Sequence, residues 1–288
     1  MGHSHPECAF NDSLILGLSN FGFSAESYYY TYLKTRKIIA NNKQIKVVFI
    51  EFTNNQINEG MYYWTWGDMY LSKFFPSYLP LMDFSDLDFL WKKNWKGIIT
   101  CPPKLYMRNI TYNILAALKL KNIETDNRFG GYTYLVRDKT DSLINISLDT
   151  IKEKSPSKIS ETNILYLSKT IEFCLSHNVK VYLIRSPQHP KYPEVRNEQQ
   201  FKEILFSKFL KIEFLDFKDF PLQNYEFADL EHLNYKGARV FSIFFNNLLD
   251  LNLLNKNNKQ DFIDNEISKI SFSEPLNSNV AKNHIGKN

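Results

Sequence analysis

The chain has 288 residues, and 43% of them are hydrophobic, so it is long enough to bury a full core within one domain. Its formal net charge of +4 results from 35 basic and 31 acidic residues that are interspersed, which argues against a nucleic-acid partner. No apolar run approaches the roughly 20 residues that a membrane-spanning helix needs, so we expect no membrane span in this sequence.

The N-terminal part of the chain alternates between strand and helix signals. Residues 16–22 (LGLSNFG) are short, apolar and end in glycine, which predicts a strand. A helix is then expected from a cap at Ser24 to the Asn41–Asn42 pair. Residues 45–53 (IKVVFIEFT) are a β-branched and aromatic run, and this near-continuous apolarity is typical of a strand buried on both faces.

The same alternation returns in the C-terminal half. Ser160 can cap a helix with one apolar stripe, and residues 179–184 (VKVYLI) follow it as a strand. Residues 198–209 predict a further helix, and residues 212–217 (IEFLDF) predict the next strand. Helices between short buried strands require crossover connections, so we expect an α/β fold with a mostly parallel sheet that helices cover on both sides.

Two regions lie outside this alternation. Residues 57–150 read as an insertion rather than as more sheet, and they hold many aromatic residues: Trp64, Trp66, Trp91, Trp95, Tyr62, Tyr63, Tyr70, Phe74, Phe75 and Tyr78. From residue 255 onward the sequence is rich in Asn, Lys and Ser and offers little to bury, so we expect residues 255–288 to form a flexible polar tail.

Two short motifs at opposite ends of the predicted domain carry complementary chemistry. The segment GHSH places Ser4 between two histidines, and a serine becomes a nucleophile only when a base takes its proton. The segment DLEH supplies such a base in His232, with Asp229 three residues before it to orient the imidazole. Loops that follow parallel strands converge on one rim of an open sheet, so we expect Ser4 and His232 to meet there.

These motifs together resemble the SGNH or GDSL hydrolase superfamily, and within it bacterial members similar to the D-alanine transfer protein and to polysaccharide O-acyl esterases and transferases. GHSH stands where the family has Gly-x-Ser, NFGFS where it has a second-block glycine, FTNN where it has Gly-x-Asn, and DLEHLNYKGA where it has Asp-x-x-His. The resemblance implies that Ser4 is the nucleophile, His232 the general base and Asp229 its orienting carboxylate. It also implies an oxyanion hole made by the N–H groups of Ser4 and Gly22 and the side chain of Asn54.

The sequence departs from the family pattern at two places. The family's glycine two residues before the block-three asparagine is Phe52 here, which leaves Asn55 as an alternative oxyanion donor to Asn54. The family's nucleophile also follows a strand inside the sheet, whereas three residues precede Ser4, so we expect a truncated first strand and a longer native form. Similar relatives often carry a membrane anchor before that strand, which would place the domain outside the cytoplasm; the sequence as given has no such segment, and its localisation stays open.

Other residues near the predicted rim have two readings each. His3, His5 and Cys8 offer metal-ligand atoms, but three ligands at a chain end make a poor cage, so we expect no metal and assign His3 and His5 to the rim of the site. Arg185 and His189 follow a strand, where they would either contact substrate or shape a proline-rich loop. The aromatic cluster of residues 57–150 would either stack on sugar rings or form core, and core is the more common use.

The sequence therefore predicts one SGNH-like domain over residues 1–254, with a three-layer α/β/α sandwich, a flavodoxin-like parallel sheet and an inserted aromatic segment. We expect a serine esterase that acts through an acyl-enzyme, without a cofactor, on O-acyl esters (acetyl esters first) of a carbohydrate or cell-surface glycan, so that its partner is a small-molecule or glycan ester. Two alternatives stay open: an O-acyltransferase in surface-polysaccharide modification, which would use the same triad, and a non-catalytic protein that binds or assembles glycans.

Overall fold

The computed structural model describes residues 1–118, 130–137, 139–144, 158–192 and 197–272. Within these ranges the chain forms three strands, β1 (Val47–Glu51), β2 (Lys180–Arg185) and β3 (Glu213–Asp216), which pair in the order β1-β2-β3. Both pairings are parallel, with Val48 opposite Val181 and Leu183 opposite Phe214. The predicted α/β class and parallel sheet are confirmed, and each strand lies within or close to its predicted range.

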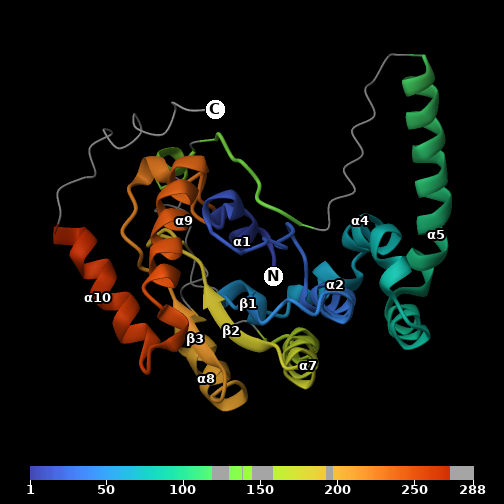
Figure 1. The fold of residues 1–288 in the computed structure, drawn as a ribbon. Helices are drawn as coiled ribbons and strands as arrows, with labels where there is room; N and C mark the ends of the chain where they lie inside the picture. The colour runs from blue at the N-terminus through green and yellow to red at the C-terminus, as the bar shows by residue number, and fades with distance from the viewer. Residues whose placement is uncertain (119–129, 138, 145–157, 193–196, 273–288) are drawn as a thin grey trace.

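Helices pack on both faces of this sheet (Figure 1). Side chains alternate across a strand, so Val48 and Ile50 of β1 face one way and Phe49 faces the other. The first core contains residues of α2 (Tyr28–Asn41), α7 (Glu161–Ser176) and α8 (Glu198–Lys208); the second contains residues of α1 (Ser4–Ala9), α9 (Tyr235–Asp250) and α10 (Lys259–Phe272). The sheet is therefore buried on both sides, as its apolar strands require.

The first two residues extend the sheet beside β1. The amine of Met1 donates to the carbonyl of Phe49 at 2.9 Å, and the Glu51 N–H donates to the Met1 carbonyl at 3.0 Å. Gly2 in turn forms a parallel bridge with Gly22. Met1 and Gly2 thus occupy a strand position between β1 and the Gly22 segment, directly before the helix that Ser4 begins.

A groove of about 880 Å³ lies along the outer edge of β1 next to Met1. Its walls include apolar side chains from the sheet and from the segments around it: Phe10, Leu16, Leu18, Ile38, Ile45, Val47, Val48, Phe49, Leu249 and Leu254. In a parallel ladder the backbone groups of alternate residues point to opposite sides. Phe49 and Glu51 bind Met1 and so turn their backbone groups away from β2. Val47 lies two residues before Phe49, so its backbone groups also point away from β2, toward the groove.

Two predicted elements near the N-terminus are wrong. Residues 16–22 form no strand beyond the bridge at Gly22, because the side chains of Asn11 and Asn20 bind the local backbone in its place: Asn11 caps η1 (Asp12–Leu14), and Asn20 accepts the N–H of Gly22. The helix expected from Ser24 begins at Tyr28, since Ala25 has a φ of 66°, which is incompatible with a helix.

Most of the described part of the 57–150 insertion is helical. After η2 (Asn54–Ile57) it forms α3 (Met61–Trp66), α4 (Asp68–Tyr78), η3 (Leu79–Leu81) and α5 (Phe84–Ala117), the last of which stands to one side of the sheet in Figure 1. None of the helices in the described ranges combines the length and apolarity needed to cross a membrane. Residues 130–137 then return to α1, where the Thr133 N–H donates to the Glu7 carbonyl at 2.9 Å.

The expected flexible tail from residue 255 is wrong for its first part. η6 (Leu253–Asn255) and α10 continue the fold, and α10 packs against β3. Ile263 is fully buried in the second core, and Gln260 bonds both the N–H and the carbonyl of Asp216. The prediction failed because it used composition alone. The segment has few apolar residues, but they recur at helical spacing and so form a helix with one apolar face. Residues 273–288 lie outside the described ranges.

Candidate active site

Ser4 lies where the short N-terminal strand turns into α1. Gly2, with a φ of 134°, makes this turn in a region that side-chain-bearing residues rarely adopt, and a Cβ at this position would lie 2.7 Å from the Cβ of Glu51. Ser4 is the first residue of α1, so its N–H has no partner within the helix. The serine is therefore presented at a helix N-terminus, where a developing negative charge is favoured.

The structure brings Ser4 together with His232 and Asp229, although 228 residues separate the serine from the histidine. The Ser4 Oγ lies 2.8 Å from Nε2 of His232, and Nδ1 of His232 lies 2.8 Å from Oδ1 of Asp229. An ionised carboxylate can only accept, so Nδ1 carries the proton and Nε2 is left to accept the serine hydroxyl. This is the hydrogen-bond order that a serine nucleophile requires.

The loop that holds Asp229 and His232 is fixed by its own hydrogen bonds. The same Oδ1 of Asp229 that meets the imidazole also accepts the N–H groups of Glu231 and His232, each at 2.9 Å. Asn234 then caps α9 by accepting the N–H groups of Lys236 and Gly237, while its amide nitrogen donates to the carbonyls of Tyr225 and Phe227. The loop is thus fixed before His232 by Asp229 and after it by Asn234, which sets the position of the imidazole.

Arg137 is a contributor to this site that no sequence motif indicated. Its Nη2 lies 2.7 Å from Oδ2 of Asp229, the carboxylate oxygen that His232 leaves free. Burial raises the pKa of Asp229, but the hydrogen bond from His232, the nearby charges and Arg137 outweigh it, so the net pKa is lowered. The carboxylate therefore stays ionised. A single arginine that belongs to no motif gives no sign of its role in the sequence. The contact with Asp229 became visible only in the structure, where residues 130–137 return to α1.

The expected oxyanion hole is not assembled as the resemblance implies. The N–H of Gly22 already donates to Asn20 at 2.8 Å. The Asn54 side chain is fully buried, its nitrogen donating to Asn197 and Glu198 and its oxygen accepting from Arg185. Both groups are committed elsewhere, which argues against their assignment as oxyanion donors.

The alternative donor, Asn55, has an amide group that is less committed. It is half-buried, and its side-chain oxygen accepts the hydroxyl of Thr53 at 2.7 Å, next to His3. Within the described ranges, no hydrogen bond occupies its amide nitrogen. The N–H of Ser4 and the amide of Asn55 are therefore the donors that this geometry leaves available.

Arg185 and His189 are structural in this arrangement. Arg185 is 1% exposed and pairs with Glu198 and with Asp216 beneath the sheet edge. His189 is 5% exposed, contacts Asn224 through Nε2 at 3.1 Å and accepts the N–H of Lys191 through Nδ1. Neither side chain is free to contact a substrate, so the substrate-binding reading of both is not supported.

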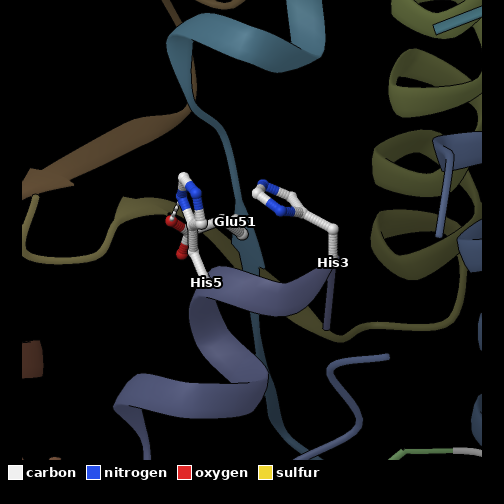
Figure 2. A group of neighbouring side chains, drawn as sticks. All are labelled: His3, His5 and Glu51. Carbon is white, nitrogen blue, oxygen red and sulfur yellow. Dashed lines mark ion pairs between the residues drawn. The ribbon is translucent and has the colours of Figure 1, made fainter. Parts of the chain in front are cut away.

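His3 and His5 do not line an exposed rim. His3 is fully buried and His5 is 1% exposed, with their ring centroids 4.3 Å apart. Burial lowers the pKa of His3 to about 3 and that of His5 well below its ordinary value, so both rings are neutral. Figure 2 shows the two imidazoles beside Glu51 at the end of β1. The predicted companion Cys8 is not part of this group, and burial raises the pKa of its thiol to about 12.

Aromatic side chains of the insertion reach the site next to His3. Trp64 is half-buried, meets the His3 ring edge-on at 6.2 Å and lies 5.8 Å from Tyr70. On α5, by contrast, Trp91 and Trp95 are about half exposed. The aromatic residues of the insertion are therefore divided between core, site wall and surface.

Comparison with known proteins adds little about activity. A model of an uncharacterised protein family matches residues 137–254, a stretch that includes Arg137, Asp229 and His232 but not Ser4. No curated protein matches the sequence.

Proposed function

We propose that this protein is an SGNH-type serine hydrolase that cleaves ester bonds. The single observation that carries this proposal is the continuous hydrogen-bonded chain from Ser4 through His232 to Asp229, with both links at 2.8 Å. Serine, imidazole and carboxylate in this order are used for acyl transfer on unrelated folds, so geometry rather than sequence order supports the assignment. The lowered pKa of Asp229 fits its role of stabilising the imidazolium.

The reaction follows from the proton positions. Nε2 of His232 takes the hydroxyl proton of Ser4 while the Oγ attacks the ester carbonyl, and the carbonyl π electrons move to its oxygen. The N–H of Ser4 and the amide of Asn55 would stabilise this oxyanion. When the intermediate collapses, His232 protonates the leaving alcohol and an acyl-enzyme remains. Water then attacks the acyl-enzyme by the same steps in reverse, releasing the acid and free Ser4.

The wider fold supports the same family reading. Parallel strands with helices on both faces are the core of an SGNH-like, flavodoxin-like sandwich. In that fold the nucleophile follows a strand beside the next strand of the sheet, and Met1 and Gly2 pair with β1 in that position.

A carbohydrate ester is the substrate class that we favour. Flat aromatic faces suit the C–H surfaces of sugar rings, and Trp64 with Tyr70 lies beside His3, one residue before the nucleophile. An O-acyltransferase would use the same triad and pass the acyl group to a sugar hydroxyl instead of water. Incubation with an acyl donor and a glycan separates the two: acylated glycan indicates transfer, and free acid alone indicates hydrolysis.

The test is labelling by a fluorophosphonate, read by mass spectrometry, together with hydrolysis of p-nitrophenyl acetate. We expect the label on Ser4, and Ser4→Ala to lose the label and on the order of 10⁴-fold of the rate. Ser13→Ala is the matched control, because Ser13 is exposed and its hydroxyl donates to the neighbouring Asn11 side chain. A folded wild-type protein that neither takes the label nor turns over in a Ser4-dependent way would disprove the hydrolase and leave a non-catalytic glycan-binding protein.

A further inference from the structure

The cluster of His3, His5 and Glu51 is not explained by the serine chemistry. All three side chains are at most 1% exposed, and one ligand atom from each lies within 4.8 Å of the other two (Figure 2). Among the described residues, the only ion-pair contact of Glu51 is one of 3.9 Å with Nδ1 of His5, an imidazole that burial keeps neutral. The site thus buries a carboxyl group without a cationic side chain in contact with it among the described residues, and burial raises the pKa of this carboxyl to about 7.

The hydrogen bonds around His3 show which of its ring nitrogens carries the proton and which carries the lone pair. The Thr53 hydroxyl has one proton and donates it to the side-chain oxygen of Asn55 at 2.7 Å. Its oxygen must therefore accept from Nε2–H of His3, which lies 3.0 Å away. Nδ1 of His3 then carries a lone pair, and it is buried without a hydrogen-bond partner among the described residues. A histidine that donates through one nitrogen and holds the other free has the arrangement of a metal ligand.

His5 offers a second imidazole to the same spot. Its Nδ1 lies at a long 3.4 Å from the amide nitrogen of Gln188, a contact that a metal ion would displace, and its Nε2 is buried without a hydrogen-bond partner among the described residues. Nδ1 of His5 faces the Glu51 carboxylate. The backbone explains how both rings reach one spot: residues two apart on a helix point to different sides, but His3 precedes α1 with extended backbone angles, so its side chain turns to the side of His5.

Glu51 completes the set from a different element. It ends β1, and its two oxygens accept the N–H and the hydroxyl of Ser186 at 2.9 and 2.8 Å, which fixes the carboxylate while leaving further lone pairs. Two imidazoles and one carboxylate are a donor set that zinc uses where a fourth position stays open for water or substrate. Zinc ligands at about 2.1 Å lie about 3.5 Å apart in a tetrahedron, so rotation of the imidazoles would have to close the group by about 1 Å.

We propose that His3, His5 and Glu51 bind one divalent transition-metal ion, with zinc as the first candidate. The ion would satisfy the free nitrogen of His3 and pair with the ionised form of the buried Glu51 side chain. The proposed metal site lies next to the triad, since Ser4 lies between the two histidines in sequence and the His5 ring meets that of His232 edge-on at 5.6 Å. The two sites share no residue. This inference goes beyond the proposed hydrolase and does not depend on it.

The experiment uses the full chain after chelator treatment, titrated with Co²⁺ and followed by visible absorption, with Zn²⁺ competition and metal analysis by mass spectrometry. We expect saturation at one equivalent, visible bands typical of a four- or five-coordinate site, and displacement by Zn²⁺. His3→Ala and Glu51→Gln should each weaken binding at least 10-fold, since even changes to groups that only hydrogen-bond a metal ligand cost about 10- to 100-fold in affinity. His177→Ala is the control, because this histidine is exposed and far from the cluster in sequence.

Three outcomes would overturn the proposal. The first is a folded wild-type protein without saturable Co²⁺ absorption. The second is binding that survives both His3→Ala and Glu51→Gln. The third is binding that survives His3→Ala but is lost in His232→Ala, which would assign the ion to the neighbouring group of His5, Glu231 and His232. Fluorophosphonate labelling of the chelated protein keeps the two proposals apart, because loss of the metal leaves the Ser4 reading intact if the label still forms.

Discussion

Single side chains decide the proton chemistry of this site, and Asp229 is the clearest case. Asp229→Asn keeps the size of the side chain but offers His232 an amide in place of a carboxylate, so the imidazole can adopt the tautomer that cannot accept from Ser4. We expect p-nitrophenyl acetate hydrolysis to fall by about 10²- to 10⁴-fold, as for the corresponding change in other serine triads. Asp219→Asn, a change at an exposed carboxylate, should leave the rate unchanged.

The same substitution has a readout in stability. The folded state lowers the pKa of Asp229, so its ionised form contributes stability above the ordinary value of 3.8, and this contribution is lost as the pH falls through the folded pKa. Asp229→Asn lacks this contribution at every pH. The difference in unfolding free energy between the two proteins, measured in urea, should therefore be larger at pH 7 than below pH 3. An equal difference at both pH values would contradict this account.

At the scale of one element, the start of α9 links stability to the site. Asn234→Ala removes the cap from Lys236 and Gly237 and leaves the carbonyl of Tyr225 without its donor, so we expect a loss of about 1–3 kcal/mol in unfolding free energy. Because α9 begins just after His232, the hydrolysis rate should fall as well. Thermal and urea unfolding, with the rate measured in parallel, check both effects.

Asn247→Ala is the matched control within the same helix. Asn247 is exposed near the end of α9, where alanine is the better helix former, so this substitution should be neutral or slightly stabilising. If Asn234→Ala were no more destabilising than Asn247→Ala, the cap would not be what holds the His232 loop.

At the scale of the whole molecule, the part of the outer β1 edge beyond Met1 is a place where stability can be added. Joining five β-branched or apolar residues to Met1 should extend the short strand along the groove, pair the outward backbone groups of Val47 and bury apolar surface. We expect the melting temperature to rise by several degrees, whereas an extension of five Gly and Ser residues should not raise it. Equal melting temperatures for both extensions would show that the groove does not accept a strand.

Local sequence patterns were sufficient to predict that strands and helices alternate along the chain. Apolar runs of strand length, periodic helical stripes and the Ser160 cap predict a parallel α/β sheet, because these signals depend only on neighbouring residues. The tail was misread for the opposite reason: α10 is stabilised by packing on β3, and a sparse apolar face becomes decisive only when a partner surface exists.

The sequence by itself determined which chemistry is available: a serine motif at one end and an Asp-x-x-His motif at the other. Only the tertiary structure decided which group each hydrogen-bonding side chain or backbone N–H has as its partner. It commits Gly22 to Asn20 and Asn54 to Arg185, and it brings Arg137 to Asp229 and Glu51 to the two histidines. Residue type fixes what a group can donate or accept, but its partner depends on contacts between distant segments, which no local spacing encodes.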